Sequence, residues 1–379
     1  MIYLDNAATS WPKPAEVFRA VAACLRRAAS PGRGGHGLSR EADRILFAAR
    51  ETLAALLGAG NSGTITFAAN ATDALNTALF GLLAPGDRAV TTSMEHNAIA
   101  RPLRALEDRG LHLAIVGCDH TGALPLDSLR TALAGGAKAI VVTHASNVTG
   151  TIMPLADIGR LARAAGALFI VDAAQTAGAE HIDVAAMGID VLAFSGHKSL
   201  LGPQGTGGLY VREGVAVEPL RHGGTGSLSE SDRQPHFYPD RLESGTPNTP
   251  GIAGLLAGVT YINKRGLEKI RTAESLLTGE LLTGLANIPG VAVYGPPPGV
   301  PRAAVVSFTV GDRDSGEIAH RLDREYGIAC RGGLHCAPWA HRTLGTLATG
   351  TVRFSPGCFT TAADIAAALT AVQAIAAGG

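Results

Sequence analysis

The sequence lacks the marks of several large classes of protein. No apolar run reaches about 18 residues, so no transmembrane helix is expected. Residues 1–6 contain no basic stretch and lead into no long apolar stretch, so no secretory signal is expected either. Basic and acidic residues balance at 32 each, which provides no excess charge for binding nucleic acid or an anionic membrane.

Cysteine is also scarce. The five cysteines are an odd number without close pairs, so a disulfide framework is not expected and no spacing is typical of a metal site. We therefore expect a reduced, cytoplasmic setting and no bound metal. The sequence also has no P-loop, no zincin motif and no glycine-rich dinucleotide fingerprint near a first strand, which argues against a dinucleotide-dependent dehydrogenase.

What the sequence does contain is a repeated alternation of short β-branched runs and helical segments between about residues 64 and 211. This pattern predicts an α/β fold whose mostly parallel sheet is covered by helices on both faces. A helix with Ser39 as its N-cap is predicted over residues 39–57, and residues 223–250 are interpreted as a long functional loop. A second alternation after Pro298 predicts a smaller α+β domain.

Polar residues follow several of the predicted strands. In an open α/β sheet, ligands bind outside the carboxyl ends of the strands. Asn70, Glu95, Asn147, Asp172 and Lys198 all occupy such positions, so they are expected to converge.

Lys198 is the most informative of these residues. It closes the segment Phe194-Ser195-Gly196-His197-Lys198, and lysine is almost never fully buried without a partner. A Schiff base with an aldehyde cofactor is one reason to place it there, because a desolvated amine becomes a usable nucleophile. A lone lysine at a strand end more often extends to solvent, so the remaining residues must decide.

Two segments suit the phosphate of such a cofactor. Ala71 and Thr72 open a helix after a strand, where backbone N–H groups and the helix dipole favour an anion. Ser195 and His197 flank the lysine and can add donors. An ordinary N-cap at Asn70 is the simpler interpretation of the first segment taken alone.

Two other residues suit a pyridine ring. Asp172, at the end of a strand, can keep the ring nitrogen protonated, or it can simply cap the next turn. His96 can stack on the ring and move protons near neutral pH, although a lone histidine is usually structural.

The C-terminal part contributes a possible nucleophile. Cys336 lies in a glycine-rich segment beside Arg331 and His335, a setting that suits a reactive thiol. Arg353 follows as a strand-end residue that can hold a substrate carboxylate in a bidentate pair, or form a surface salt bridge.

In their order along the chain these pieces resemble the class V aminotransferase superfamily of fold-type I enzymes, which depend on pyridoxal 5'-phosphate (PLP). Within it the chain is similar to a cysteine desulfurase or selenocysteine lyase of the group II, SUF-like kind. The matching segments include Ser195-Gly196-His197-Lys198, Glu243-Ser244-Gly245-Thr246-Pro247-Asn248-Thr249 and Leu334-His335-Cys336-Ala337. Residues 3–9, 33–36, 94–97, 146–150 and 171–175 match as well.

The resemblance implies a PLP-binding large domain, residues 15–255, built on a mostly parallel seven-stranded sheet flanked by helices. Residues 1–14 and 256–379 would form the small α+β domain that contains the nucleophile loop. A homodimer is implied too, with Thr246 and His36 reaching the neighbouring subunit's site.

The resemblance also implies residue roles. Lys198 would carry PLP and act as base at the substrate Cα, His96 would stack on the ring and relay protons, and Cys336 would take sulfur from L-cysteine as a persulfide, leaving L-alanine. The implied cofactor-binding residues are Ala71, Thr72, His96, Asn147, Asp172, Gln175, Ser195, His197, Lys198 and Thr246. The implied substrate-binding residues are Ala8, His36, Asn147, Arg331 and Arg353.

Such a sulfurtransferase would serve iron–sulfur cluster assembly and could pass its sulfur to an acceptor protein. Two positions depart from the family pattern: Leu334 stands where a second histidine is more frequent, and Ala173 replaces a frequent glycine. The alternatives are a class V aminotransferase or other PLP enzyme without a cysteine nucleophile, and a PLP-binding scaffold without turnover.

Overall fold

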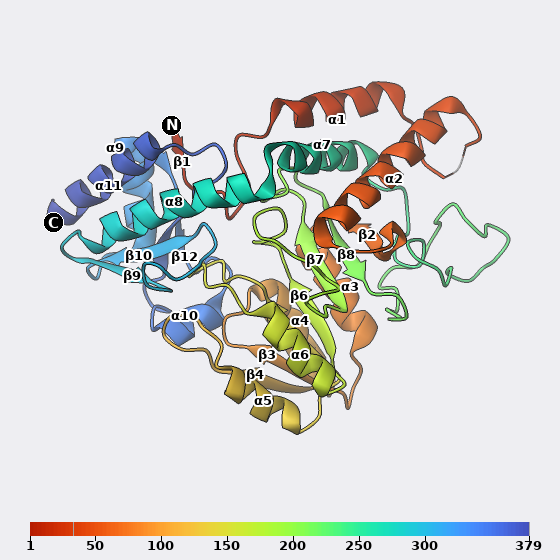
Figure 1. Cartoon of the computed structure of the whole chain (residues 1–379), viewed down its shortest axis with the longest axis horizontal. Coiled ribbons are helices and arrows are strands. Elements are labelled where there is room, and N and C mark those ends of the chain that lie inside the picture. The colour runs from red at the N-terminus through yellow and green to blue at the C-terminus, as the bar shows by residue number, and fades with distance from the viewer. Residues whose placement is uncertain (33, 379) are drawn as a thin grey trace.

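The computed structural model describes residues 1–32 and 34–378. Arg33, the first residue of the segment 33–36, lies outside the described residues. Figure 1 shows a large body around a central sheet and a smaller body that contains both chain ends. None of the helices in the described part of the chain is both long and apolar enough to cross a membrane.

The central sheet has seven strands in the order β2-β8-β7-β6-β5-β3-β4. Its strands are β2 (Ile65–Ala68), β3 (Arg88–Thr92), β4 (His112–Val116), β5 (Ala139–Thr143), β6 (Leu168–Asp172), β7 (Val191–Ser195) and β8 (Gly207–Val211). Strands β4, β3, β5, β6 and β7 pair in parallel, and β8 pairs antiparallel with both β7 and β2. The prediction of a mostly parallel seven-stranded sheet in an α/β fold is confirmed.

Apolar residues on both sides of its central strands explain why this sheet is covered twice. In β5, Ile140 and Val142 belong to one core and Val141 to the other, since successive side chains point to opposite faces. The Val141 face packs against α3 (Ala71–Leu82) and α4 (Asn97–Glu107). The opposite core includes side chains of α5 (Leu126–Ala134) and α6 (Leu155–Ala164), which lie in front of the sheet in Figure 1.

Three further helices pack beside the sheet's β2 end. They are α1 (Ala15–Arg27), α2 (Gly37–Leu57) and α7 (Thr249–Arg265), with a short 3-10 turn at Ser62–Thr64. The sequence predicted Ser39 as the N-cap of α2, and this is wrong. The helix begins at Gly37 with His36 as its N-cap, because the His36 ring accepts from the Ser39 N–H while the Ser39 hydroxyl donates to the Ser30 carbonyl.

The smaller body is built on a four-stranded antiparallel sheet, β12-β13-β10-β9. Its strands are β9 (Val291–Tyr294), β10 (Val306–Val310), β12 (Arg331–Gly333) and β13 (Thr351–Phe354). Its helices are α8 (Leu267–Ala286), α9 (Ser315–Tyr326), α10 (Pro338–Leu344) and α11 (Ala362–Ala377). The strands β9 and β12 and the helix α10 were not anticipated from the sequence.

A two-stranded parallel pair connects the beginning of the chain to this smaller body. Strand β1 (Ile2–Tyr3) pairs with β11 (Ile328–Ala329), and Leu4 is buried in the same core as Phe308 and Phe354. The proposed division of the chain near residue 255 stays a prediction.

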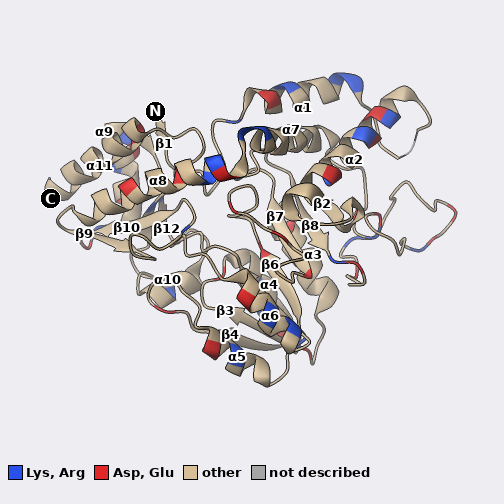
Figure 2. Ribbon diagram, viewed as in Figure 1, with Lys and Arg blue, Asp and Glu red and all other residues tan. Residues whose placement is uncertain are grey.

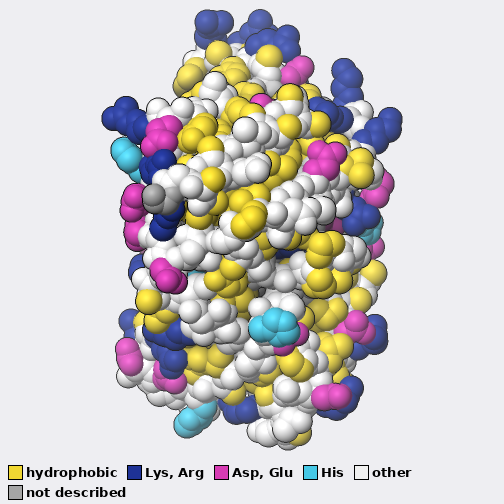
Figure 3. Space-filling model, turned by 90° about the vertical axis from the view of Figure 1, so that its left-hand side faces the viewer, with side chains coloured by type: hydrophobic (Ala, Val, Ile, Leu, Met, Phe, Trp, Pro, Cys, Tyr) yellow, Lys and Arg dark blue, Asp and Glu magenta, His cyan; other side chains and the backbone are white. Residues whose placement is uncertain are grey.

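Charged and apolar side chains are mixed over the surface. Figure 2 shows acidic and basic residues interspersed along α1, α2 and α6, and Figure 3 shows apolar groups interleaved with charged ones on one side of the molecule. Such scattered apolar side chains are normal on a folded protein.

One mostly buried ion pair lies between α2 and the end of the long loop. The Glu243 carboxylate accepts both Arg50 guanidinium nitrogens at 2.7 Å and the Phe67 N–H at 2.6 Å, and only 10% and 15% of the Arg50 and Glu243 side chains are exposed. Replacing Glu243 with alanine is expected to cost about 3–5 kcal/mol of unfolding free energy, because the Arg50 charge stays buried without its partner.

Chemical unfolding of the Glu243→Ala variant measures this loss. The matched control is Glu325→Ala, which breaks the surface pair with Arg321 and should change the unfolding free energy by less than about 0.5 kcal/mol. Equal effects of the two substitutions would contradict the role given to the buried pair.

Candidate active site

A cleft lies at the carboxyl ends of β3, β5, β6 and β7, where the sequence placed the site. It is lined by Ala71, Thr72, His96, Ala98, Thr143, Ala145, Asn147, Asp172, Ala174, Gln175, Ser195 and Lys198. Parallel strands bring these residues together although they come from segments far apart in the chain.

Lys198 follows β7 in a tight turn and lines the cleft. Burial lowers the pKa of its amine to about 8, and the Arg353 guanidinium adds to this effect while the Asp172 carboxylate opposes it. An amine with this pKa is neutral far more often at neutral pH than an ordinary lysine. The side chain is therefore suited to attack a carbonyl carbon.

The backbone of the Lys198 turn is held by the N-terminal segment. The His197 carbonyl accepts from the Ser10 N–H at 3.0 Å and from Lys13 Nζ at 2.7 Å, and the Ser10 hydroxyl donates to the Lys198 carbonyl at 2.8 Å. Burial lowers the pKa of Lys13 to about 8. No pattern in the sequence indicates this contact, because Lys13 lies in a proline-rich turn 184 residues before His197.

Asp172 ends β6 with only 3% of its surface exposed. Burial raises the pKa of its carboxyl group, while an N–H bond from Ala174 at 2.9 Å and the nearby Lys198 favour the charged form. A buried carboxyl group at this position can pair with a protonated ring nitrogen.

His96 is held as a neutral ring. It is the N-cap of α4, and its Nδ1 accepts from the Ala98 N–H at 3.0 Å, which assigns the ring proton to Nε2. Burial, followed by the charge of Lys198, lowers its pKa to about 3. Glu95, just before it, is fully buried and accepts from the Thr92 hydroxyl and the Thr143 N–H.

Burial also raises the Glu95 pKa to about 8, and the Asp172 carboxylate adds to this shift. Glu95 therefore ties the ends of β3 and β5 together beneath the cleft without adding a full negative charge at neutral pH. The sequence placed Glu95 after a strand but assigned it no role.

The opening turn of α3 supplies the anion-binding end of the cleft. Asn70 caps the helix by accepting from the Asp73 N–H, and the Ser195 hydroxyl accepts from the Ala71 N–H at 3.2 Å. His197 Nδ1 is buried and has no hydrogen-bond partner among the described residues. The N–H groups and the dipole at a helix start are the chemistry that a phosphate group requires.

Arg353 and Cys336 come to the cleft from the smaller body. Arg353 is almost fully buried, pairs with Asp5 at 2.7 Å and donates to the Asn147 carbonyl at 3.1 Å. Its Nε is buried without a partner in the described chain. The exposed Cys336 has its Sγ 3.8 Å from the Arg331 guanidinium, and both Cys336 and Arg331 act electrostatically on Lys198.

Three predicted residues have other surroundings. Ala8 follows Ala7, whose carbonyl accepts from Gln175 Nε2 at 3.1 Å. Within one chain, His36 and Thr246 are exposed and do not line the Lys198 cleft; Thr246 lines surface hollows beside Glu243.

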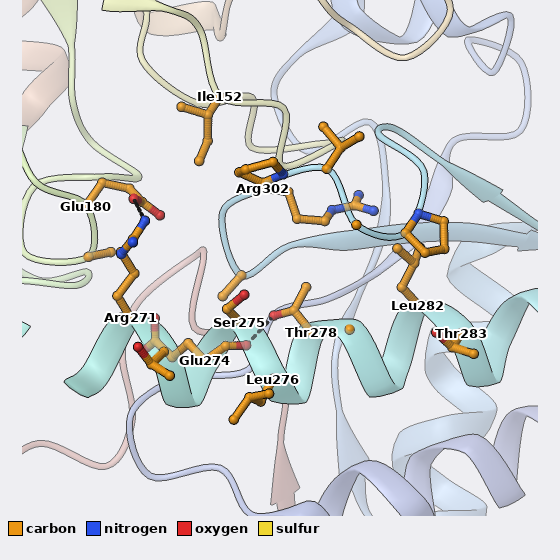
Figure 4. A pocket seen from close by; sticks show the side chains of 18 residues that line it. Ile152, Glu180, Arg271, Glu274, Ser275, Leu276, Thr278, Leu282, Thr283 and Arg302 are labelled. Atoms are coloured by element: carbon orange, nitrogen blue, oxygen red, sulfur yellow. Dashed lines mark hydrogen bonds and ion pairs between the residues drawn. The ribbon is translucent and has the colours of Figure 1, made fainter. Parts of the chain in front are cut away.

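A separate cavity of about 520 Å³ lies beside α8 (Figure 4). Glu180 and Arg271 form an ion pair at one end of it, Arg302 lies on the opposite side, and no predicted site residue lines it. No group of three or more His, Cys, Asp or Glu side chains in residues 1–32 and 34–378 is arranged to hold a metal ion.

The residues of the Lys198 cleft fit PLP. A buried amine with a lowered pKa lies near a buried carboxyl group, and a neutral imidazole is fixed nearby. The start of α3 and His197 Nδ1, which has no partner among the described residues, suit an anion.

Fold and site together define a protein of the PLP-dependent class. The chain belongs to the class-V aminotransferase family, whose model matches residues 2–368. It is 36% identical over 371 residues to a probable cysteine desulfurase of Methanothermobacter thermautotrophicus, covering 96% of this chain and 92% of the relative. A cysteine desulfurase of Serratia proteamaculans is 36% identical over 347 residues, covering 89% and 84% of the two chains.

Solved structures show the same likeness. The apo structure of a cysteine desulfurase from Thermococcus onnurineus superposes with a TM-score of 0.94 at 35% identity, covering all of this chain and 95% of that one. The cysteine desulfurase CsdA of Escherichia coli, in an S-sulfonic acid form, gives a TM-score of 0.87 at 28% identity, covering 99% and 94%.

Proposed function

We propose that this protein is a PLP-dependent cysteine desulfurase, which converts L-cysteine to L-alanine and takes the sulfur on Cys336 as a persulfide. The observation that carries the proposal is the exposed Cys336 thiol, held beside Arg331 and within electrostatic reach of the buried Lys198 amine. The names of the relatives support the same substrate. An aminotransferase without a nucleophile, or a scaffold without turnover, has no use for this cysteine.

Lys198, Asp172, His96 and Gln175 would hold the cofactor's ring, with Asn147 nearby. Ala71, Thr72, Ser195 and His197 would hold its phosphate. When bound, PLP supplies an electron sink for the negative charge that forms at the substrate Cα.

The chain's own groups do the rest. Arg353 binds the substrate carboxylate, with Ala8 and Arg331 beside it, and the Lys198 amine removes the Cα proton. The Cys336 sulfur then attacks the substrate sulfur, so that an S–S bond forms and the Cβ–S bond breaks. The electron pair of the broken bond stays with carbon, so Cβ takes a proton relayed by His96. The proton held by Lys198 returns to Cα to complete alanine, and no external oxidant is needed.

The remaining assignments concern partners and setting. In a homodimer, Thr246 would reach the phosphate in the neighbouring subunit and His36 would line that subunit's site, which accounts for their distance from the cleft of their own chain. The exposed Phe18 and Phe47 side chains on α1 and α2 provide apolar surface for such a contact.

We place the enzyme in the cytoplasm, in iron–sulfur cluster assembly, with a sulfur-acceptor protein that approaches Cys336 past Leu334.

A product assay tests the proposal. The purified protein loaded with PLP should convert L-cysteine to equal amounts of alanine and, with a thiol reductant present, sulfide. L-selenocysteine carries the same groups around a selenium atom and should be assayed in parallel. Formation of pyruvate and ammonia, or transfer of the amino group to a keto acid without sulfide, would contradict the proposal.

A further inference from the structure

The segment of residues 147–150 is joined to the smaller body at every carbonyl. The Asn147 carbonyl accepts from Arg353 and the Val148 carbonyl from the Ser307 hydroxyl at 2.6 Å. The Thr149 carbonyl accepts from Arg302 and the Gly150 carbonyl from the Ala303 N–H at 2.8 Å. These four bonds fix the segment as a seam between the two bodies.

The approach at the seam is close. A Cβ atom at Gly150 would lie 2.8 Å from the Val305 carbonyl oxygen and 2.9 Å from that of Ala303, and Gly150 has a φ of +72°. Only glycine fits such an approach in this conformation. The backbone from which the Asn147 side chain projects is therefore fixed.

The Asn147 side chain is 6% exposed and lines the Lys198 cleft. Its Nδ2 donates to the His335 carbonyl at 2.7 Å, and the next carbonyl, of Cys336, accepts from the Asn97 N–H at 2.8 Å. His335 and Cys336 have φ values of +49° and +58°, which L-residues rarely adopt. Such a conformation persists only where surrounding contacts hold it.

We propose that Asn147 is a positioning residue for the nucleophile: through the His335 carbonyl it holds the left-handed turn that keeps Cys336 Sγ beside the Arg331 guanidinium. This inference rests on the proposed function and adds to the cofactor and substrate contacts expected of Asn147. The charged groups near the sulfur are Arg331, which contacts it, and Lys198; the His335 ring faces Thr351 instead.

The test measures the rate of Cys336 alkylation by iodoacetamide at one fixed pH, followed by peptide mass spectrometry. Cys336 can be followed because the other thiols are buried or have a raised pKa, about 11 for Cys118 and about 12 for Cys330 and Cys358. In Asn147→Ala the rate of Cys336 alkylation should fall about threefold to tenfold, because the sulfur leaves the guanidinium that favours a reactive thiol. Asn287→Ala, an exposed change at the end of α8, should leave the rate unchanged.

A double-mutant cycle separates positioning from a general loss of structure. Arg331→Ala should slow the alkylation of Cys336 as well, and adding Asn147→Ala to it should cause little further loss of rate. An unchanged rate in Asn147→Ala, or an equal loss in the Arg331→Ala background, would overturn the inference. If Asn147→Ala does not fold, Asn147→Asp keeps the volume and removes the donor.

The alkylation is measured in the PLP-loaded protein without substrate. It therefore reports the position of Cys336 whether or not L-cysteine is the substrate. Failure of the product assay with a positive cycle would reject the proposed function alone, and the reverse result would reject only the role of Asn147.

Discussion

Replacing Lys198 with alanine is expected to remove the visible absorbance that borohydride bleaches and to lower cysteine desulfuration by about a thousandfold or more. In the proposed mechanism the amine is both the attachment point for PLP and the base at the substrate Cα, and losses of this size are typical when a residue with both roles is removed. Its position makes the substitution specific, since the backbone carbonyls of the turn still accept from the Ser10 hydroxyl and the Lys13 amine.

Absorbance spectra and product assays on Lys198→Ala check this result, with Lys264→Ala, a change at an exposed lysine, as the control. The rate at which cofactor-free wild-type protein takes up PLP gives a second measure of the reactivity of Lys198. Because the Lys198 pKa is about 8, PLP uptake should speed up as the pH rises through 8, where an ordinary lysine would require a pH above 10. At pH 7.5 this lowered pKa makes the neutral form of the Lys198 amine about two orders of magnitude more abundant than the neutral form of an ordinary lysine. A variant that keeps bleachable absorbance would refute the assignment.

The general architecture could be predicted because local sequence determines it. Strand β5 is apolar at every position through Val142, so it must be covered on both faces, and helices follow in sequence to cover it. Once a parallel sheet is inferred, the residues after its strands must meet at one edge. His96, Asp172 and Lys198 could therefore be placed together without knowing any contact between them.

The supporting contacts could not be predicted, because they join residues that are far apart in sequence and have no pattern of their own. Asp5 pairs with Arg353 across 348 positions, and Asn147 reaches the His335 carbonyl across 188. The burial that raises the Glu95 pKa is likewise a property of the assembled core. The N-cap of α2 was missed for a local reason: Ser39 is the common capping type, yet the His36 ring performs that task.

The proposed reaction depends most directly on Cys336. Replacing it with alanine is expected to lower sulfide and alanine formation from L-cysteine by about a hundredfold or more, while the cofactor absorbance stays as in the wild type. The exposed thiol lies on a turn held by Asn147 and Asn97, so its replacement takes away the proposed sulfur acceptor and leaves the hydrogen bonds of the Lys198 turn in place.

Cys358→Ala is the matched control, because burial raises the Cys358 pKa to about 12 and leaves that thiol inert. In the wild type, treatment with L-cysteine should add one sulfur atom to the peptide that contains Cys336 and none to the peptide that contains Cys358. Unchanged desulfuration by Cys336→Ala would reject the nucleophile and leave a PLP enzyme that releases sulfur directly. If only L-selenocysteine turnover survives the substitution, the thiol is needed for the less reactive C–S bond alone, and the cleft without Cys336 is a selenocysteine lyase.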